Sequence, residues 1–152
     1  MHGYKMARVS AFKNKETKDK IRKIFTENTE SVEYYKIVYG YSMQKKLLSR
    51  KVSGYIIGYD KDENKIIAIH IRFNGELIEK PFNFTVENVS NIVVKGKDKV
   101  QIFSSLLLKP ITITVASSIG TTMESALLYP VNQEEGAQDF IEFAKVFLKR
   151  RK

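Results

Sequence analysis

Histidine and cysteine, two residue types that often serve in catalytic and metal sites, are scarce in this chain of 152 residues. The histidines are His2 and His70, and there is no cysteine, which excludes disulfides, thiolate nucleophiles and thiolate metal sites. A catalytic histidine needs a nucleophile and an orienting acid, and no sequence pattern places either beside His70. Two separated histidines do not form a metal ligand set. We therefore expect no catalytic residue, no metal site and no cofactor.

An acidic cluster and two glycines give weaker signals. Asp60, Asp62 and Glu63 resemble part of a calcium loop, but the glycine and the distal glutamate of such a loop are missing at the required spacing. A plain acidic hairpin turn is the favoured interpretation. Gly54 and Gly58 lack the spacing of a phosphate loop, so they predict a bulge or a close strand approach.

Basic residues are the strongest chemical signal, because they are unevenly spread. The net charge is +9, and residues 1–51 carry 13 Lys/Arg against 5 Asp/Glu. Such asymmetry can mark a surface for phosphates, nucleic acid or anionic lipid, and a solvated lysine-rich face is the alternative. The candidate anion-binding patch is Lys45, Lys46, Arg50 and Lys51, and a second basic patch is Lys149, Arg150, Arg151 and Lys152.

Both patches have competing interpretations. Four basic residues near an anionic membrane are worth about 4 kcal/mol, which gives weak, salt-sensitive attachment. The second patch is more simply a helix end that complements the helix dipole. Tyrosines near the first patch could stack nucleic-acid bases, although their spacing is equally typical of packing in a core or on a sheet face. These tyrosines are Tyr34, Tyr35, Tyr39 and Tyr41.

The elements that position these residues are mainly short strands. An irregular lead-in over 1–13 precedes a helix within 14–31, with Asn14 as its cap and Ile21, Ile24 and Phe25 at helical spacing. From Val32 the period becomes two, which is typical of strands. The predicted strands cover residues 32–43, 52–59, 65–73, 76–85, 89–95, 100–103, 111–115 and 123–129, with a basic interruption at 44–51.

Three local features refine this pattern. Asn74-Gly75 predicts a type I′ turn, because both central residues of that turn need positive φ. Pro81 predicts an edge position or a bulge for its strand. His70 shares a strand face with Ala68 and Arg72, opposite the isoleucines of the same strand, and we expect that face to be exposed or half-exposed.

Residues 132–151 are predicted to form one amphipathic helix. Asn132 is its expected cap, with Glu135 three residues on as in a capping box. Such an apolar stripe must be covered, and the open end of a strand-built barrel is the natural cover. The stripe comprises Ala137, Phe140, Ile141, Ala144, Phe147 and Leu148, with Phe143 beside it.

This order of elements, seven or eight antiparallel strands in a meander and then one amphipathic helix, resembles the pleckstrin-homology-like barrel in its small bacterial type. Residues 84–92 are similar to the family's strand and the acidic-polar step that follows it, and residues 137–148 are similar to its plugging helix. The resemblance covers about residues 32–150. It implies phosphoinositide binding by Lys45, Lys46, Arg50 and Lys51, in the loop between the first two strands. It also implies protein binding or oligomerisation, which many members of the fold use instead.

Together these observations predict a single, mostly β domain: an antiparallel, partly open barrel over 32–152 with a C-terminal helix and an extra N-terminal helix. We expect a non-enzymatic binding module that engages a protein partner or a second copy of itself, with no small-molecule substrate. The alternative is attachment to anionic lipid or nucleic acid through the basic N-terminal face. No apolar run approaches the roughly 20 residues of a membrane-spanning helix, and the start lacks a secretory signal. We therefore expect a cytoplasmic protein, with a peripheral position at the membrane as a second option.

Overall fold

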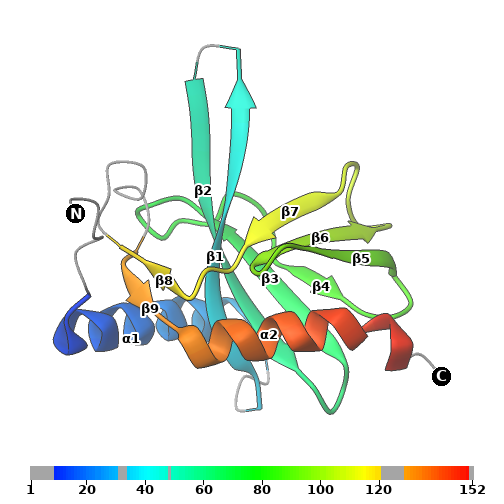
Figure 1. Cartoon of the computed structure of the whole chain (residues 1–152), viewed down its shortest axis with the longest axis horizontal. Coiled ribbons are helices and arrows are strands. Elements are labelled where there is room, and N and C mark those ends of the chain that lie inside the picture. The colour runs from blue at the N-terminus through cyan, green and yellow to red at the C-terminus, as the bar shows by residue number, and fades with distance from the viewer. Residues whose placement is uncertain (1–8, 31–33, 48, 121–128, 151–152) are drawn as a thin grey trace.

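A computed structural model describes residues 9–30, 34–47, 49–120 and 129–150 of the chain. Helix α1 (Ala11–Asn28) opens this part, and helix α2 (Glu134–Val146) with the short 3-10 helix η2 (Leu148–Arg150) closes it. Between them lie a seven-stranded antiparallel sheet and a small two-stranded sheet (Figure 1). The strands are β1 (Lys36–Lys46), β2 (Ser49–Asp60), β3 (Lys65–Ile71), β4 (Phe82–Phe84), β5 (Val89–Lys95), β6 (Lys99–Ser104), β7 (Ile111–Thr114), β8 (Ser118–Ile119) and β9 (Val131–Asn132).

The large sheet curves into a nearly closed barrel. Its strand order is β4-β3-β2-β1-β7-β6-β5, so β1–β4 and β5–β7 are two meanders that meet where Tyr41 pairs with Thr114. Strands β4 and β5 lie at the two ends of the sheet, yet only residues 85–88 separate them in the chain. This short connection holds the two ends close together. The antiparallel, partly open barrel predicted from the sequence is confirmed, with two joined meanders in place of one.

Helix α2 covers the barrel as its apolar stripe predicted. Ala137, Phe140, Ile141, Phe143, Ala144 and Phe147 are all buried. They pack with one core cluster that includes Val38, Tyr55, Ile57, Tyr59, Ile66, Ala68, Phe84, Val100, Ile102 and Ile113.

The predicted cap of this helix is wrong. The helix begins after Gln133, and Asn132 instead lies in β9, where its side-chain oxygen accepts a hydrogen bond from the Ser118 hydroxyl at 2.8 Å. Pairing of β9 with β8 therefore removes Asn132 from the capping position.

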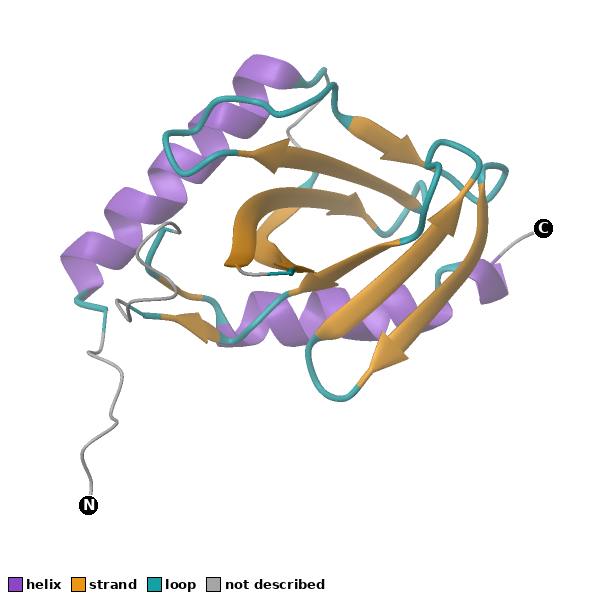
Figure 2. Cartoon of the chain, turned by 90° about the horizontal axis from the view of Figure 1, so that it is seen from above, coloured by secondary structure: helices purple, strands orange, loops and turns teal. Residues whose placement is uncertain are grey.

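Helix α1 begins earlier than predicted and covers the outer face of the sheet. Ser10 is its cap, accepting a hydrogen bond from the Lys13 N–H at 3.1 Å. Asn14, the predicted cap, accepts instead from the backbone N–H of Asn132 at 2.7 Å. The helix packs on a second core, on a different side of the strands from α2 (Figure 2). This core comprises Ile21, Phe25, Tyr39, Ile56, Ile67, Ile69, Ile71, Ile119, Tyr129 and Val131.

Because a helix covers each side, β3 is buried on both faces. Ala68 is fully buried, and the His70 side chain is only 15% exposed. The strand face that carries His70 is therefore more enclosed than the sequence pattern predicted. The alternation between isoleucines and other residues marks two separate cores rather than a core and a solvent face.

The turn after β3 differs from the prediction. Gly75 has a φ of +89°, whereas Asn74 is not in the left-handed region. The Gly75 N–H donates to the Arg72 carbonyl at 2.9 Å, and the Arg72 N–H donates to the Glu76 carbonyl at 2.8 Å. These bonds define a three-residue hairpin loop with glycine at its left-handed position, not a type I′ turn.

Two other predicted strands, over residues 76–85 and 123–129, are tested only in part by the structure. Beyond Pro81, only Phe82–Phe84 forms a strand, and it lies at the edge of the sheet as predicted. The predicted strand over 123–129 lies outside the described residues except for Tyr129. Within the described ranges, neither helix combines the length and the apolar character needed to cross a bilayer.

Candidate functional site

Strands β1 and β2 continue beyond the barrel as a projecting ribbon. The pairing of β1 with β7 is at Tyr41, and the pairing of β2 with β3 reaches Gly54. From these points outward, residues 42–46 pair with residues 49–53 (Figure 1). We call residues 42–53 the basic hairpin. The predicted loop over 44–51 is therefore wrong, because the strands run to Lys46 and restart at Ser49.

The register of the basic hairpin gathers the first predicted patch. Lys45 lies opposite Arg50, and Gln44 lies opposite Lys51. Cα atoms of directly opposed residues are about 4.5–5.5 Å apart, and like charges in such positions destabilise a strand pair. Lys51 is exposed, whereas the side chains of Lys45, Lys46 and Arg50 lie outside the description. The backbone thus concentrates positive charge in an arrangement that strand pairing alone does not favour.

Apolar side chains accompany this charge. Leu47, at the tip of the basic hairpin, is fully exposed, and Met43 is 39% exposed. Single exposed leucines are common on protein surfaces. Here, however, the leucine directly follows β1 at the tip of the hairpin, between two basic segments.

The second predicted patch lies elsewhere. Lys149 is exposed in η2, while the Arg150 side chain, Arg151 and Lys152 lie outside the described residues. The end of α2 and η2 is far from the tip of the basic hairpin (Figure 1). The structure therefore does not bring the two patches together.

The remaining sequence signals have structural explanations. The Asp60 carboxylate accepts hydrogen bonds from the N–H groups of Asp62 and Glu63 at 3.0 and 3.2 Å, as in a plain turn. Gly58 leaves room for the Phe25 ring, and Gly54 leaves room for the Tyr39 ring. Among the described residues, no group of three or more His, Asp or Glu side chains could hold a metal ion.

The tyrosines near the patch follow the packing interpretation in part. Tyr39 is buried, and the Tyr35 ring lies 5.8 Å from that of Phe25. Tyr34 is 78% exposed. A row of tyrosines open for base stacking is therefore not formed.

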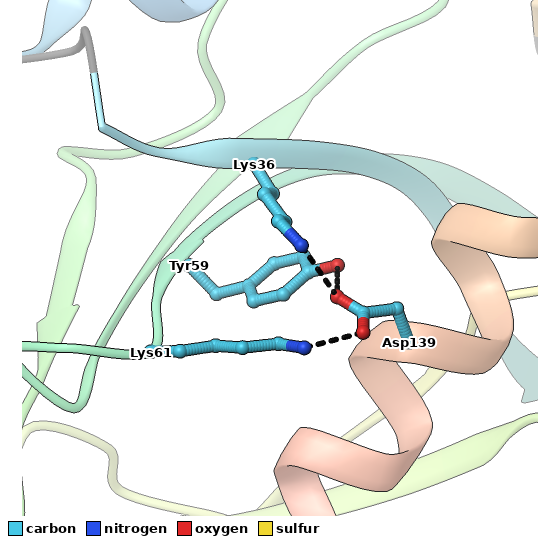
Figure 3. A network of polar contacts seen from close by, with 4 residues as sticks. All are labelled: Lys36, Tyr59, Lys61 and Asp139. Carbon is cyan, nitrogen blue, oxygen red and sulfur yellow. Dashed lines mark hydrogen bonds and ion pairs between the residues drawn. The ribbon is translucent and has the colours of Figure 1, made fainter.

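A polar network ties α2 to the strands through Asp139 (Figure 3). The Tyr59 hydroxyl donates to this carboxylate at 2.7 Å, and the Lys36 Nζ lies 3.4 Å from it. The Lys61 ammonium also donates to it. One aspartate of α2 is thus held by β1, by β2 and by the turn that follows β2.

Burial, hydrogen bonds and nearby charges together set the protonation states of this network. Burial acts to raise the pKa of Asp139, but the hydrogen bonds from Lys61 and Tyr59 and the charges of Lys36 and Lys61 outweigh it, so the pKa falls below the usual 3.8. Burial, and then the bond to Asp139, raise the pKa of Tyr59 far above its usual range. Tyr59 therefore remains a neutral donor and Asp139 an ionised acceptor at neutral pH.

We expect Asp139→Asn to lower the free energy of unfolding by about 1–2 kcal/mol at neutral pH, because partly exposed charged hydrogen bonds are lost. A group whose pKa is lowered on folding stabilises the fold above its unfolded pKa and loses that effect as pH falls through the folded pKa. The difference between wild type and variant should therefore shrink below about pH 3.8, the ordinary value. Urea unfolding at several pH values measures it, with Glu142→Gln on the same helix as control. A difference that is constant with pH would contradict this assignment.

The structure also brings partners to His70 that the sequence spacing did not reveal. Its Nε2 lies 2.6 Å from the Ser53 Oγ, and its Nδ1 lies 2.9 Å from a carboxylate oxygen of Glu79. Its ring stacks on that of Tyr55, with centroids 4.3 Å apart and planes 1° apart. Because Tyr55 and His70 are directly paired across β2 and β3, the sheet register creates this cluster.

No protein-family model matches the chain, and a search of curated proteins gives no match.

Proposed function

We propose that the chain is a pleckstrin-homology-like binding module that attaches to an anionic membrane surface through the basic hairpin. The nearly closed antiparallel barrel and its C-terminal helix support the family assignment. In that family the connection between the first two strands carries head-group binding, and here the same connection holds the predicted patch.

Two features of the basic hairpin support the proposal: it projects beyond the barrel, and its register places basic residues opposite each other. It places Lys45 directly opposite Arg50, which raises the energy of the free protein. A bound anionic surface relieves this repulsion. The exposed Leu47 at the tip supplies an apolar group that a bilayer can accept and bulk water does not favour.

The expected affinity is weak and reversible. Four basic residues contribute about 4 kcal/mol near an anionic leaflet. Burial of one exposed leucine adds about 1.5–3 kcal/mol. The sum corresponds to a dissociation constant of roughly 10–100 μM, as expected for a protein that attaches and leaves.

The test is cosedimentation with vesicles of phosphatidylserine and phosphatidylcholine against phosphatidylcholine alone. We expect binding to the anionic vesicles to weaken at least tenfold in Lys45→Glu/Lys46→Glu, because two attractions become repulsions. The matched control is Lys18→Glu/Lys23→Glu, which changes the net charge equally on the exposed face of α1. Equal losses in both double variants would contradict a hairpin-specific site.

Two further arms identify the surface. Leu47→Ser should weaken vesicle binding several-fold and leave binding to a DNA duplex unchanged, because DNA offers phosphates without an acyl layer. Release of the protein from vesicles by added DNA would favour nucleic acid as the partner. No binding to either would leave the protein-partner or self-association hypothesis, which stays a prediction.

A further inference from the structure

The cluster of Ser53, His70 and Glu79 has the connectivity of a nucleophile, a general base and an orienting acid. An ionised glutamate only accepts hydrogen bonds, so the proton between Glu79 and His70 belongs to His70 Nδ1. In the neutral imidazole, Nε2 then carries the lone pair and can accept the Ser53 hydroxyl proton across 2.6 Å. The arrangement meets two geometric requirements of an activated serine: nucleophile bonded to base, and base bonded to orienter.

The surroundings hold this geometry and leave the serine reachable. The stacked Tyr55 ring fixes the plane of the imidazole. Ser53 is partly exposed and lies one residue outside the β2–β3 pairing, which reaches Gly54. The hydroxyl therefore stands at the root of the basic hairpin, where β2 leaves the barrel. An open position of this kind suits a small electrophile.

We propose that Ser53 is a catalytic nucleophile for the hydrolysis of small acyl esters, with His70 as its general base and Glu79 as a positioning residue. Ser53 Oγ attacks the ester carbonyl carbon, and its proton passes to His70 Nε2. The bond to the leaving alcohol breaks, and the alcohol takes the proton from Nε2. Water then attacks the acyl-serine, gives a proton to Nε2, and releases the carboxylic acid as the proton returns to Ser53 Oγ.

The first experiment treats the folded protein with a fluorophosphonate probe and maps the modified peptide by mass spectrometry. We expect one adduct, on Ser53, and the mapping needs no variant to fold. Ser42→Ala is the matched control, since Ser42 lies directly opposite Ser53 and is also partly buried. It should leave the labelling rate unchanged. The absence of an adduct on Ser53, or equal labelling of many serines, would overturn the proposal.

The second experiment follows hydrolysis of p-nitrophenyl acetate, with folding of each variant checked by circular dichroism. Ser53→Ala should abolish the protein-dependent rate, and His70→Gln should lower it roughly 100-fold or more, the usual range for loss of a general base. A wild-type rate in either variant would overturn the proposal. The charge-matched control is Lys18→Glu/Lys23→Glu on the exposed face of α1, which should retain the full rate.

The positioning role of Glu79 is tested by the tautomer of His70, which a purely structural role of Glu79 would not change. Side-chain ¹⁵N shifts of His70 distinguish the two neutral tautomers. We expect the Nδ1–H form in the wild type and a shift toward Nε2–H in Glu79→Ala, together with slower hydrolysis. An unchanged tautomer with an unchanged rate would remove Glu79 from the proposal and leave no orienting acid.

Discussion

Replacing Gln133 by leucine should lower the free energy of unfolding by about 3–5 kcal/mol. Gln133 is only 7% exposed, and its side-chain amide occupies the place of a missing strand partner. The amide oxygen accepts from the Tyr39 N–H at 2.9 Å, and the amide nitrogen donates to the Tyr39 carbonyl at 2.6 Å. It also donates to the Ala116 carbonyl at 2.8 Å.

The size of the effect follows from where these bonds lie. The ladder between β1 and β7 consists of the pair at Tyr41, so two residues away the buried backbone of Tyr39 depends on Gln133. Leucine fills a similar volume but leaves these backbone groups unsatisfied, at about 1–3 kcal/mol for each buried group. A loss of this size is a large fraction of the 5–15 kcal/mol that stabilises a typical domain.

Urea denaturation measures this loss. Gln138→Leu is the matched control, because Gln138 is exposed on the outer side of α2, and it should change stability by less than about 0.5 kcal/mol. Similar losses in both variants would show that the amide of Gln133 does not act as a strand partner.

Phe25→Ala should destabilise the protein by about 3–5 kcal/mol, the usual range for truncation of a buried aromatic residue. Phe25 is fully buried between α1 and the sheet, and its ring lies against Gly58 of β2. Any Cβ at Gly58 would overlap this ring, so the absence of a side chain at Gly58 allows α1 to pack closely against β2. Removal of the ring leaves a cavity between α1 and β2.

A control on the same helix tests the interpretation. Phe12 is 78% exposed, so Phe12→Ala should change stability by no more than about 0.5 kcal/mol. Thermal unfolding and amide hydrogen exchange of α1 measure both variants. Rapid exchange in α1 with an otherwise stable barrel would show that the helix is an appendage, contrary to the continuous second core that we describe.

The sequence predicted the barrel because its signals are local. Alternation of large apolar residues marks strands such as Lys65–Ile71, and helical spacing marks α2. The outer parts of β1 and β2 carry no such alternation. Lys45, Lys46 and Arg50 belong to strands only because the two strands pair with each other, which is a property of the folded chain.

The capping errors have a different cause. Asn14 and Asn132 both have suitable side chains for caps, but each bonds to another element instead. Gln133 precedes α2 without a side-chain cap bond. Glutamine is not among the residues preferred at this position, and its amide bonds to Tyr39 and Ala116 instead of capping the helix.

The cluster around His70 could not be read from spacing. Ser53 and Glu79 lie on either side of His70 in the chain, separated from it by a turn and by a hairpin loop. Only the pairing of Tyr55 with His70, and the bond from the Ile78 N–H to the His70 carbonyl, bring them together. The contacts of His70 depend on the register of the sheet and could not be predicted from the sequence. The positive charge of the basic hairpin, by contrast, could be recognised directly from its residue types.

The placement of the two helices has a consequence for how the chain folds during its synthesis. Strands β1–β3 are made early, yet their inner face is covered by α2, which lies about 60–100 residues later in the sequence. Ribosomes add about 5–20 residues per second, so this apolar face waits for several seconds or more before its cover exists. Helix α1, made first, can shield the outer face at once. The nascent chain is thus protected on one side only until α2 has been made, and covering of the inner face is a late step of folding.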